Sequence, residues 1–199
     1  MGVTTWVVVL VKDFDSAKQR LTPALGTRSR RTLARRNAHL AVSAAAAGGH
    51  VLVVTGSDEV AEMAVAWGAD VLVEPHEDGQ NIAARRGIEQ AQARGAGAVL
   101  LLSSDLPLVT PDAVARLLRA AAQHASPVAV AVPAIGRGGT NALYLRPPDV
   151  IGLHFGDESL AQFQEDAEAR EVEFVVFHSE AMALDLDEPS DLARLSRAV

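Results

Sequence analysis

The stretch that decides the fold is Trp6-Val-Val-Val-Leu-Val11, an unbroken apolar run followed directly by Lys12. A strand of a parallel sheet that is covered on both faces is apolar throughout, so this run predicts a buried strand. Four more runs have the same character, at residues 51–55, 71–73, 98–102 and 128–132. Helical patterns lie between them, and this alternation predicts an α/β fold with a mostly parallel sheet and helices on both faces.

The expected helices carry recognisable start and stop signals. A long Arg- and Ala-rich helix is expected over 29–47, ending at Gly48-Gly49. Ser57 stands before two acids in a position typical of a helix N-cap, and Thr110-Pro111-Asp112 gives a cap, a first-turn proline and an acid in order.

The part of the chain from Arg137 onward has a different pattern. It predicts a short strand over 142–145, a helix over 158–169, a strand over 172–177 and a helix from Pro189. No linker-like or low-complexity stretch interrupts the chain. We therefore expect this part to extend the same sheet, and the chain to form a single domain over 1–199.

Composition excludes several classes of protein. The formal net charge is -7, which argues against a general nucleic-acid binder. The absence of cysteine excludes disulfides, thiol catalysis and Cys-ligated metal sites. No apolar run reaches membrane-spanning length, and the first residues do not resemble a signal peptide. A soluble cytoplasmic protein is the expectation.

Basic residues follow the first predicted strand, where ligands of open α/β sheets bind. Lys12, Lys18 and Arg20 lie in one short stretch that could cradle a polyphosphate, although a solvated basic surface fits the spacing equally well. Neither G-x-x-x-x-G-K-[ST] nor G-x-G-x-x-G follows the strand, so the P-loop and dinucleotide fingerprints are absent.

Carboxylates follow two other apolar segments. Asp105 comes just after the 98–102 strand, where it is better placed to hold Mg²⁺ against a phosphate than to pack. In an extended segment, Asp185 and Asp187 point to the same side. We assign Asp185 to the metal site, and Asp187 either to the surroundings of that metal or to the cap of the helix from Pro189.

Turn-like segments supply weaker candidates. Thr140 follows two glycines, and Gly156 and Ser159 lie at the start of a predicted helix, where exposed amides suit an anion. Gly79 and Asn81 occupy a similar position before another helix. Taken alone, each segment is more often an ordinary turn or cap.

Together these segments resemble the 2-phospho-L-lactate / phosphoenolpyruvate guanylyltransferases of coenzyme F-420 biosynthesis, over nearly the whole chain. The resemblance is carried by motifs in the family's order: Lys12…Ala17-Lys18-Gln19-Arg20-Leu21, Ser104-Asp105-Leu106-Pro107, Gly138-Gly-Thr-Asn-Ala-Leu143, Phe155-Gly156…Ser159 and Leu184-Asp-Leu-Asp-Glu-Pro-Ser-Asp-Leu192. Two departures are Leu10, where the family often has proline, and Gln80-Asn81-Ile82 in place of a Gly-Leu-Asn-Ala run.

The resemblance implies a GT-A-like, Rossmann-related nucleotidyltransferase that transfers GMP from GTP to a three-carbon phospho-acid and releases pyrophosphate. It implies Mg²⁺ at Asp105 and Asp185, and the acid's carboxylate at Thr140, Gly156 and Ser159. It also implies the nucleotide phosphates at Lys12, Lys18 and Arg20, with Gly79 and Asn81 as further candidate nucleotide contacts. We expect phosphoenolpyruvate as the acid, since the Ala- and Arg-rich composition is typical of high-GC bacteria. A transferase that receives the product is also implied, and a homodimer is compatible with it.

Other functions stay open at this point. One is a related nucleotidyltransferase with another acceptor, such as 3-phosphoglycerate or molybdopterin. Another is an NAD(P)-dependent oxidoreductase, which the missing glycine fingerprint disfavours. A third is a non-catalytic nucleotide-binding regulator, which the intact Asp105 and Asp185 disfavour.

Overall fold

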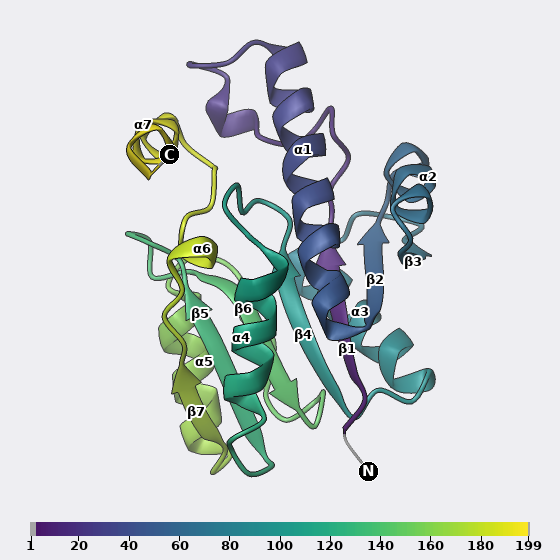
Figure 1. The fold of residues 1–199 in the computed structure, drawn as a ribbon, viewed down its shortest axis with the longest axis vertical. Helices are drawn as coiled ribbons and strands as arrows, with labels where there is room; N and C mark the ends of the chain where they lie inside the picture. Colours follow the sequence, from purple (N-terminus) through teal and green to yellow (C-terminus); the bar gives the residue numbers. More distant parts are fainter. Residues whose placement is uncertain (1–2, 199) are drawn as a thin grey trace.

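The computed structural model describes residues 3–198, which form one seven-stranded sheet (Figure 1). The strands are β1 (Thr5–Leu10), β2 (His50–Thr55), β3 (Asp70–Val73), β4 (Ala98–Ser103), β5 (Val128–Pro133), β6 (Thr140–Arg146) and β7 (Glu173–Val176). Their order across the sheet is β3-β2-β1-β4-β6-β5-β7. Among the described strands, only β6 runs antiparallel to its neighbours. The predicted mostly parallel sheet is confirmed, and the part after Arg137 extends it.

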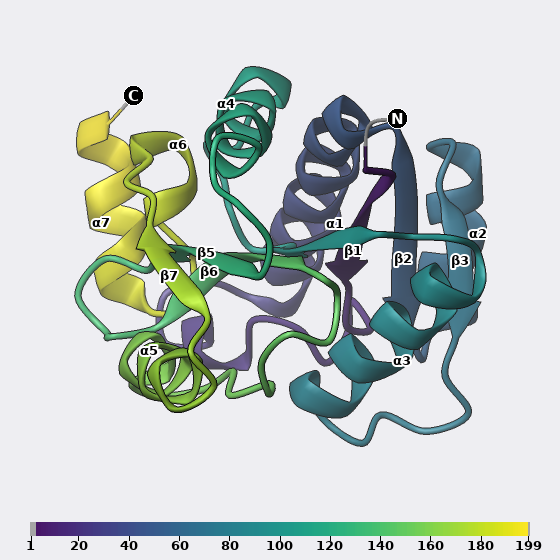
Figure 2. The same ribbon diagram turned by 90° about the horizontal axis from the view of Figure 1, so that it is seen from below.

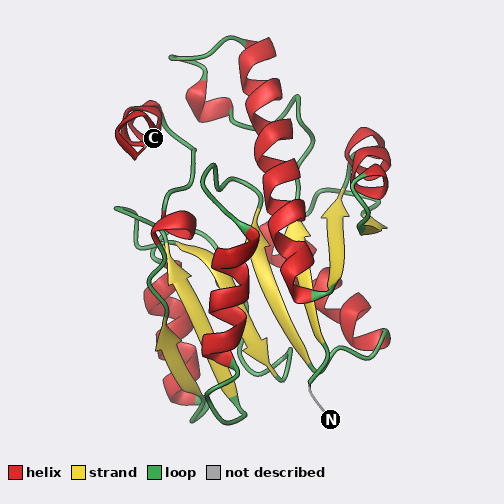
Figure 3. Cartoon of the chain, viewed as in Figure 1, coloured by secondary structure: helices red, strands yellow, loops and turns green. Residues whose placement is uncertain are grey.

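Helices cover both faces of this sheet (Figures 2 and 3). They are α1 (Thr27–Ala45), α2 (Asp58–Ala66), α3 (Gln80–Ala93), α4 (Pro111–Ala121), α5 (Ser159–Ala169), α6 (Glu180–Ala183) and α7 (Pro189–Ala198), with 3-10 turns η1 (Gln19–Leu21) and η2 (Ala46–Gly48). One core cluster joins the sheet to α1, α2, α4 and α6, and the other joins it to α3 and α5. None of the helices formed by residues 3–198 has the length and apolar character needed to cross a membrane.

The central strand β1 shows why the sheet is covered on both sides. Val7 and Val9 belong to the first core cluster, whereas Trp6 and Val8 belong to the second. All four side chains are at most 2% exposed. Successive residues of a strand face opposite sides, so a run that is apolar on both sides requires cover on both.

The helix boundaries differ from expectation in two places. Thr110 caps α4 as expected, accepting from the amide of Ala113 at 3.2 Å. Ser57 precedes α2, but its hydroxyl makes no cap and instead donates to Asp13 at 2.9 Å. The long helix α1 begins at Thr27, two residues earlier than predicted, and gives way to η2 after Ala45. Met1, Gly2 and Val199, at the ends of the predicted domain, lie outside the described residues.

The antiparallel strand β6 matters most for the site. Its first residue, Thr140, pairs with Pro133 at the end of β5, and Ala142 pairs with Leu102 near the end of β4. The start of β6 therefore lies at the same edge of the sheet as the ends of the parallel strands, and this is the edge where ligands of such sheets bind.

Candidate active site

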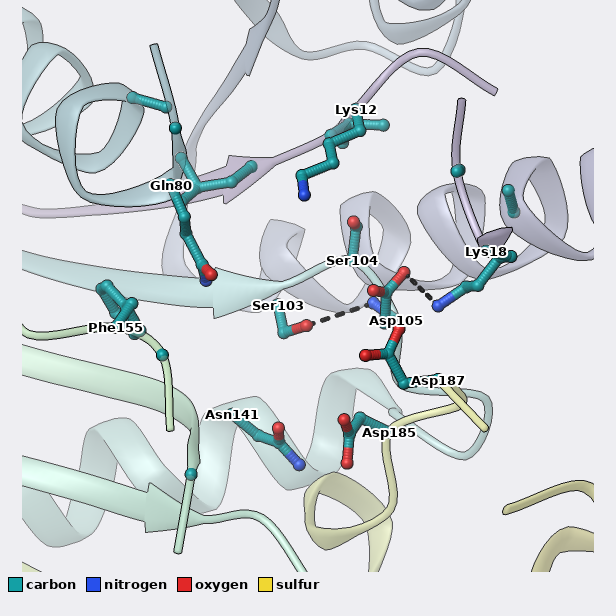
Figure 4. Close-up of a pocket in the computed structure, with 18 of the residues that line it drawn as sticks. Lys12, Lys18, Gln80, Ser103, Ser104, Asp105, Asn141, Phe155, Asp185 and Asp187 are labelled. Atoms are coloured by element: carbon teal, nitrogen blue, oxygen red, sulfur yellow. Dashed lines mark hydrogen bonds and ion pairs between the residues drawn. The ribbon is translucent and has the colours of Figure 1, made fainter. Parts of the chain in front are cut away.

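A pocket of about 630 Å³ opens at this edge of the sheet. Ten of the predicted site residues line it: Lys12, Lys18, Arg20, Gly79, Asp105, Thr140, Gly156, Ser159, Asp185 and Asp187. Segments more than 170 residues apart in the sequence thus meet around one cavity (Figure 4). Asn81 is not among the lining residues.

The loop after β1 is folded rather than extended. Asp13 accepts hydrogen bonds from the amides of Asp15 and Ser16 and from the hydroxyl of Ser57. Although burial alone would raise the pKa of Asp13, these bonds hold it below its ordinary value. Phe14 is buried, with 1% exposure. The loop is therefore held in place both by hydrogen bonds and by apolar packing.

The basic residues of this loop have different environments. Lys12 is exposed, extends toward the pocket in Figure 4 and forms no ion pair with any described residue. Arg20 forms a direct pair with Asp187 at 3.3 Å on the surface, where its side chain is 65% exposed. Lys12 is therefore available to an incoming anion, whereas a pair as exposed as that of Arg20 contributes little stability.

Lys18 is buried, whereas a solvated basic loop would leave its side chain exposed. Its side chain is 1% exposed, and its ammonium lies 2.6 Å from Oδ1 of Asp105. It also donates to the carbonyl oxygen of Leu186 at 2.6 Å. The backbone of Lys18 has φ 60°, a left-handed conformation that side chains other than glycine rarely adopt. The buried contacts hold this conformation in place.

The acidic segment near the C-terminus lies directly against the loop that holds Asp105. The amide of Leu186 donates to the carbonyl oxygen of Asp105 at 3.1 Å. Leu184 and Leu186 are buried, whereas Asp185 and Asp187 line the pocket. The alternation of apolar and acidic residues thus places both carboxylates beside Asp105.

Arg137, which the sequence did not single out, organises these carboxylates. Its Nη1 lies 3.1 Å from Oδ2 of Asp185 and 3.8 Å from Oδ2 of Asp187, and its Nη2 bonds Asp191. The residue lies in a glycine-rich loop, which is a weak signal because such loops often carry a solvated arginine. Only its contact with a segment 48 residues away reveals its part in the site.

The pKa values of the two buried acids move in opposite directions. Burial raises the pKa of Asp185 above its ordinary value, and Arg137 offsets only part of that effect. Burial also acts to raise the pKa of Asp191, but the amides of Glu188 and Asp187 and the Arg137 guanidinium outweigh it and bring the pKa down. The ionised form of Asp191 is therefore stabilised by hydrogen bonds and a nearby cation, whereas Arg137 does not fully compensate the burial of Asp185.

Asp191, not Asp187, completes the start of α7. Its Oδ2 accepts from the amide of Glu188 at 2.8 Å and from that of Asp187 at 3.0 Å. An acid in the first turn that bonds back to the amide before the helix is half of a capping box. The cap considered for Asp187 is thus supplied by Asp191, and the carboxylate of Asp187 lines the pocket instead.

The carboxylates fit a magnesium ion that is shared with a substrate. Among residues 3–198, no three His, Asp or Glu side chains converge as a ready-made metal cage. Mg²⁺ in nucleotide sites commonly takes one or two protein carboxylates and completes its shell with phosphates and water. Asp105, 40% exposed, and Asp185, with a raised pKa, provide such a partial set of oxygen ligands.

On the opposite wall, two hydroxyl groups are joined. The hydroxyl of Ser159 donates to that of Thr140 at 3.1 Å, and the two residues are 1% and 9% exposed. Gly156 lines the same wall with φ 140°, a conformation suited to glycine. The wall therefore offers hydroxyl groups and helix-start amides, which are suitable partners for a carboxylate.

The glycine loop before β6 is attached to the start of α5. The amide of Leu160 donates to the carbonyl oxygen of Gly138 at 2.9 Å. Gly138 has φ 62°, a left-handed conformation that favours glycine. This packing is what brings Thr140 to Ser159.

The side chain of Asn81, a predicted nucleotide contact, bonds the backbone of Phe155. Its side-chain amide donates to the carbonyl oxygen of Phe155 at 3.1 Å, and its side-chain oxygen accepts from the amide of Phe155 at 2.8 Å. Its neighbour Gln80 extends into the pocket (Figure 4), and Gly79 is also among the lining residues. Asn81 thus joins the start of α3 to the loop that carries Gly156.

Comparison with known proteins identifies the family. Residues 5–196 match the family model described as "Guanylyl transferase CofC like". The chain belongs to this family. The resemblance seen in the motifs is thereby confirmed.

Relatives with different named acceptors match almost the entire chain. A phosphoenolpyruvate guanylyltransferase of Rubrobacter xylanophilus is 39% identical, covering 97% of this chain and 94% of the relative. A 2-phospho-L-lactate guanylyltransferase of Methanothermobacter thermautotrophicus is 31% identical, covering 96% and 83%. A 3-phospho-D-glycerate guanylyltransferase of Colwellia psychrerythraea is also 31% identical, covering 96% and 91%.

A solved structure places the fold among nucleotidyltransferases. A nucleotidyl transferase of Methanothermobacter thermautotrophicus superposes with a TM-score of 0.68 at 18% identity, covering 99% of this chain and 98% of the other. The GT-A-like, Rossmann-related fold expected from the sequence is confirmed.

Proposed function

We propose that this member of the CofC-like family transfers GMP from GTP to the phosphate of phosphoenolpyruvate, releasing pyrophosphate, in coenzyme F-420 biosynthesis. One observation carries the proposal. A single pocket holds, on one side, two partly buried carboxylates and a lysine that forms no ion pair with residues 3–198, and on the other a buried hydroxyl pair beside a helix start. Residues 1–199 would act as one nucleotidyltransferase domain.

The chemistry requires positioning more than proton transfer. A phosphate oxygen of the acid attacks the α-phosphorus of GTP, and the bond from that phosphorus to the bridging oxygen breaks as pyrophosphate leaves. The attacking phosphate is already an anion at neutral pH, so no strong general base is needed. The difficulty is to bring two polyanions together and to stabilise their charge in line.

The chain's own cations meet that need in different ways. Lys12 would bind the nucleotide phosphates directly, because no described residue competes for it. Lys18 would act indirectly, because its buried ion pair holds Asp105 in place. Arg20 would be drawn to the phosphates from its weak pair with Asp187.

Mg²⁺ would be held by Asp105 and Asp185, with Asp187 close by. When bound, it supplies positive charge that neutralises the phosphates at the reacting centre. Two features of this chain support that ligand set: both carboxylates line the pocket, and Asp185 has less positive charge around it than its burial requires.

The acid would lie against Thr140, Gly156 and Ser159, with its carboxylate on the hydroxyl pair. Phosphoenolpyruvate is the proposed acceptor because relatives at 39%, 35% and 33% identity carry that name. 2-Phospho-L-lactate and 3-phosphoglycerate share the same carboxylate and phosphate. The product, a phosphoanhydride, would be passed to a downstream transferase, and a homodimer is a further prediction.

The test is a parallel assay of pyrophosphate release from GTP with the three acids at equal concentration, with and without Mg²⁺. We expect release with phosphoenolpyruvate to exceed release with the other two. Asp105→Asn should abolish most of it, whereas Asp112→Asn, which alters a 69% exposed carboxylate on α4, serves as the matched control. Preference for another acid would overturn the acceptor, and no release with any acid would overturn the function.

A further inference from the structure

A buried carboxylate lies on the pocket wall at the β3 side of the sheet. The acid-binding residues lie on the other wall, at the β6 side. Glu74 follows β3, and its amide donates to the carbonyl oxygen of Thr55 at 2.8 Å, which fixes it beside the end of β2. Its side chain is 5% exposed, yet it lines the pocket along with Gly56 and Glu77. None of the roles assigned so far uses it.

The orientation of Glu74 is fixed from outside the pocket. Arg86 Nη1 lies 2.6 Å from Oε1 of Glu74, and Arg86 Nη2 lies 2.6 Å from Oδ2 of Asp78. Arg86 lines a smaller outer hollow but not the main pocket, whereas Glu74 borders both. The oxygen bonded to Arg86 therefore lies on the outer side.

The second oxygen of Glu74 remains for a ligand. Within residues 3–198, Oε2 accepts no hydrogen bond, and it is not closed off from open space. A carboxylate oxygen that is held in place, reaches open space and bonds no protein donor can accept charge-assisted hydrogen bonds from the N–H groups of a ligand. The site is thus built to receive a donor.

The location restricts what that donor can be. An anion on the wall repels phosphates, so the triphosphate belongs near Lys12 and the metal-binding carboxylates. The parts of the nucleotide left for the Glu74 wall are the ribose and the base, and the base is the part whose donors differ between nucleotides. Guanine presents two adjacent donors, N1–H and the exocyclic amine, whereas adenine presents the acceptor N1 at the matching place.

We infer that Glu74 reads guanine, its carboxylate accepting from N1–H and the exocyclic amine while Arg86 holds it in position. This inference rests on the proposed use of GTP and adds the residue that selects the base. Each carboxylate oxygen accepts two hydrogen bonds, so Oε2 can accept from both guanine donors while Oε1 stays bonded to Arg86.

The experiment measures nucleotide binding without any phospho-acid. GTP, ITP, XTP and ATP compete against N-methylanthraniloyl-GTP in the presence of Mg²⁺. ITP lacks the exocyclic amine, and XTP replaces it with a carbonyl. A lost hydrogen bond to a charged group predicts that the wild-type protein binds ITP at least about tenfold more weakly than GTP, and XTP and ATP more weakly still.

Glu74→Gln tests the residue itself. It should bring GTP, ITP and ATP to within a few-fold of one another by weakening GTP. The matched control is Glu59→Gln, which breaks an equally short arginine pair, with Arg31 at 2.6 Å, outside the pocket. This control should keep the wild-type order of affinities.

Two results would overturn the inference. One is a wild-type protein that binds ITP or ATP as tightly as GTP, a result that needs no variant to fold. The other is a folded Glu74→Gln protein with undiminished preference for GTP. Failure of the proposed function would look different, since base selectivity would persist in binding while no acid released pyrophosphate.

Discussion

The ammonium of Lys18 lies 2.6 Å from a carboxylate oxygen of Asp105 and 2.6 Å from the carbonyl oxygen of Leu186. One buried cation thus joins the loop after β1, the loop after β4 and the acidic segment before α7. The carboxylates proposed to hold the metal are positioned by this contact as much as by the sheet.

Lys18→Met and Lys12→Met should therefore have different effects. Lys18→Met leaves the Asp105 contact unpaired and should lower the free energy of unfolding by about 2 kcal/mol or more, together with activity. Lys12→Met should leave stability within about 0.5 kcal/mol of the wild-type value. It should nevertheless lower kcat/KM for GTP about tenfold or more. Denaturant unfolding beside steady-state kinetics measures both; wild-type kinetics in Lys12→Met would place the triphosphate elsewhere.

Asp185→Asn should separate stability from activity. Because burial raises the pKa of Asp185 in the folded protein, its ionised form is disfavoured there at every pH above its ordinary pKa. Neutral Asn should consequently leave the melting temperature at pH 7 unchanged or higher, while Mg²⁺-dependent turnover falls by more than about tenfold. A lowered melting temperature with retained turnover would remove Asp185 from the metal site.

Thr140→Val and Ser159→Ala should weaken the phospho-acid more than GTP. Each removes a hydroxyl from the buried pair, and a lost donor in such a site costs about 1–3 kcal/mol. KM values for the acid and for GTP, measured separately, check this. If only the KM for GTP rose, the two halves of the pocket would be assigned in reverse.

Asn81→Ala should act on the acid although Asn81 does not line the pocket. It removes both bonds to the backbone of Phe155 and frees the loop that carries Gly156. We expect the KM for the acid to rise about three- to tenfold with a smaller change for GTP. Gln80→Ala, which alters a neighbouring side chain that does enter the pocket, is the comparison. Equal effects on both substrates would assign Asn81 a general structural role.

Asp166 should make stability depend on acid pH. Burial acts to raise its pKa, but Arg170, the amide of Gly152 and His154 bring it down to about 2 from 3.8. Its contribution is therefore complete above about pH 4 and is lost as the pH falls through about 2. Asp166→Asn should be about 1–2 kcal/mol less stable at pH 7, and this difference should shrink in acid unfolding curves below pH 4.

The fold was predictable because the strands are apolar on both faces. The run from Trp6 to Val11 requires cover on two sides wherever it folds, and the glycine and proline signals around it are local. The positions of Asp105 and Asp185 at the site could also be predicted, because an acid just after a buried strand, or alternating with buried leucines, has few structural uses.

What could not be predicted depends on contacts between distant segments. Lys18 has the sequence context of a solvated lysine, and only the approach of Leu186, 168 residues away, buries it. Arg137 and Glu74 follow the same rule, because their partners lie on other segments: Asp185 before α7, and Arg86 on α3. Asn81 was named as a nucleotide contact from its place at a helix start, which carries no information about the direction of a side chain.

Because β6 runs in the reverse direction, the two substrates are proposed to contact different parts of the sequence. The residues proposed to meet the acid, from Thr140 to Ser159, lie within one short piece of sequence, whereas Lys12, Glu74 and Asp105 all precede it. Evolution toward a different acid can therefore change this one short segment and leave the nucleotide-binding residues intact. Relatives named for three different acids, each alignable with this chain over almost its whole length, are what such an arrangement allows.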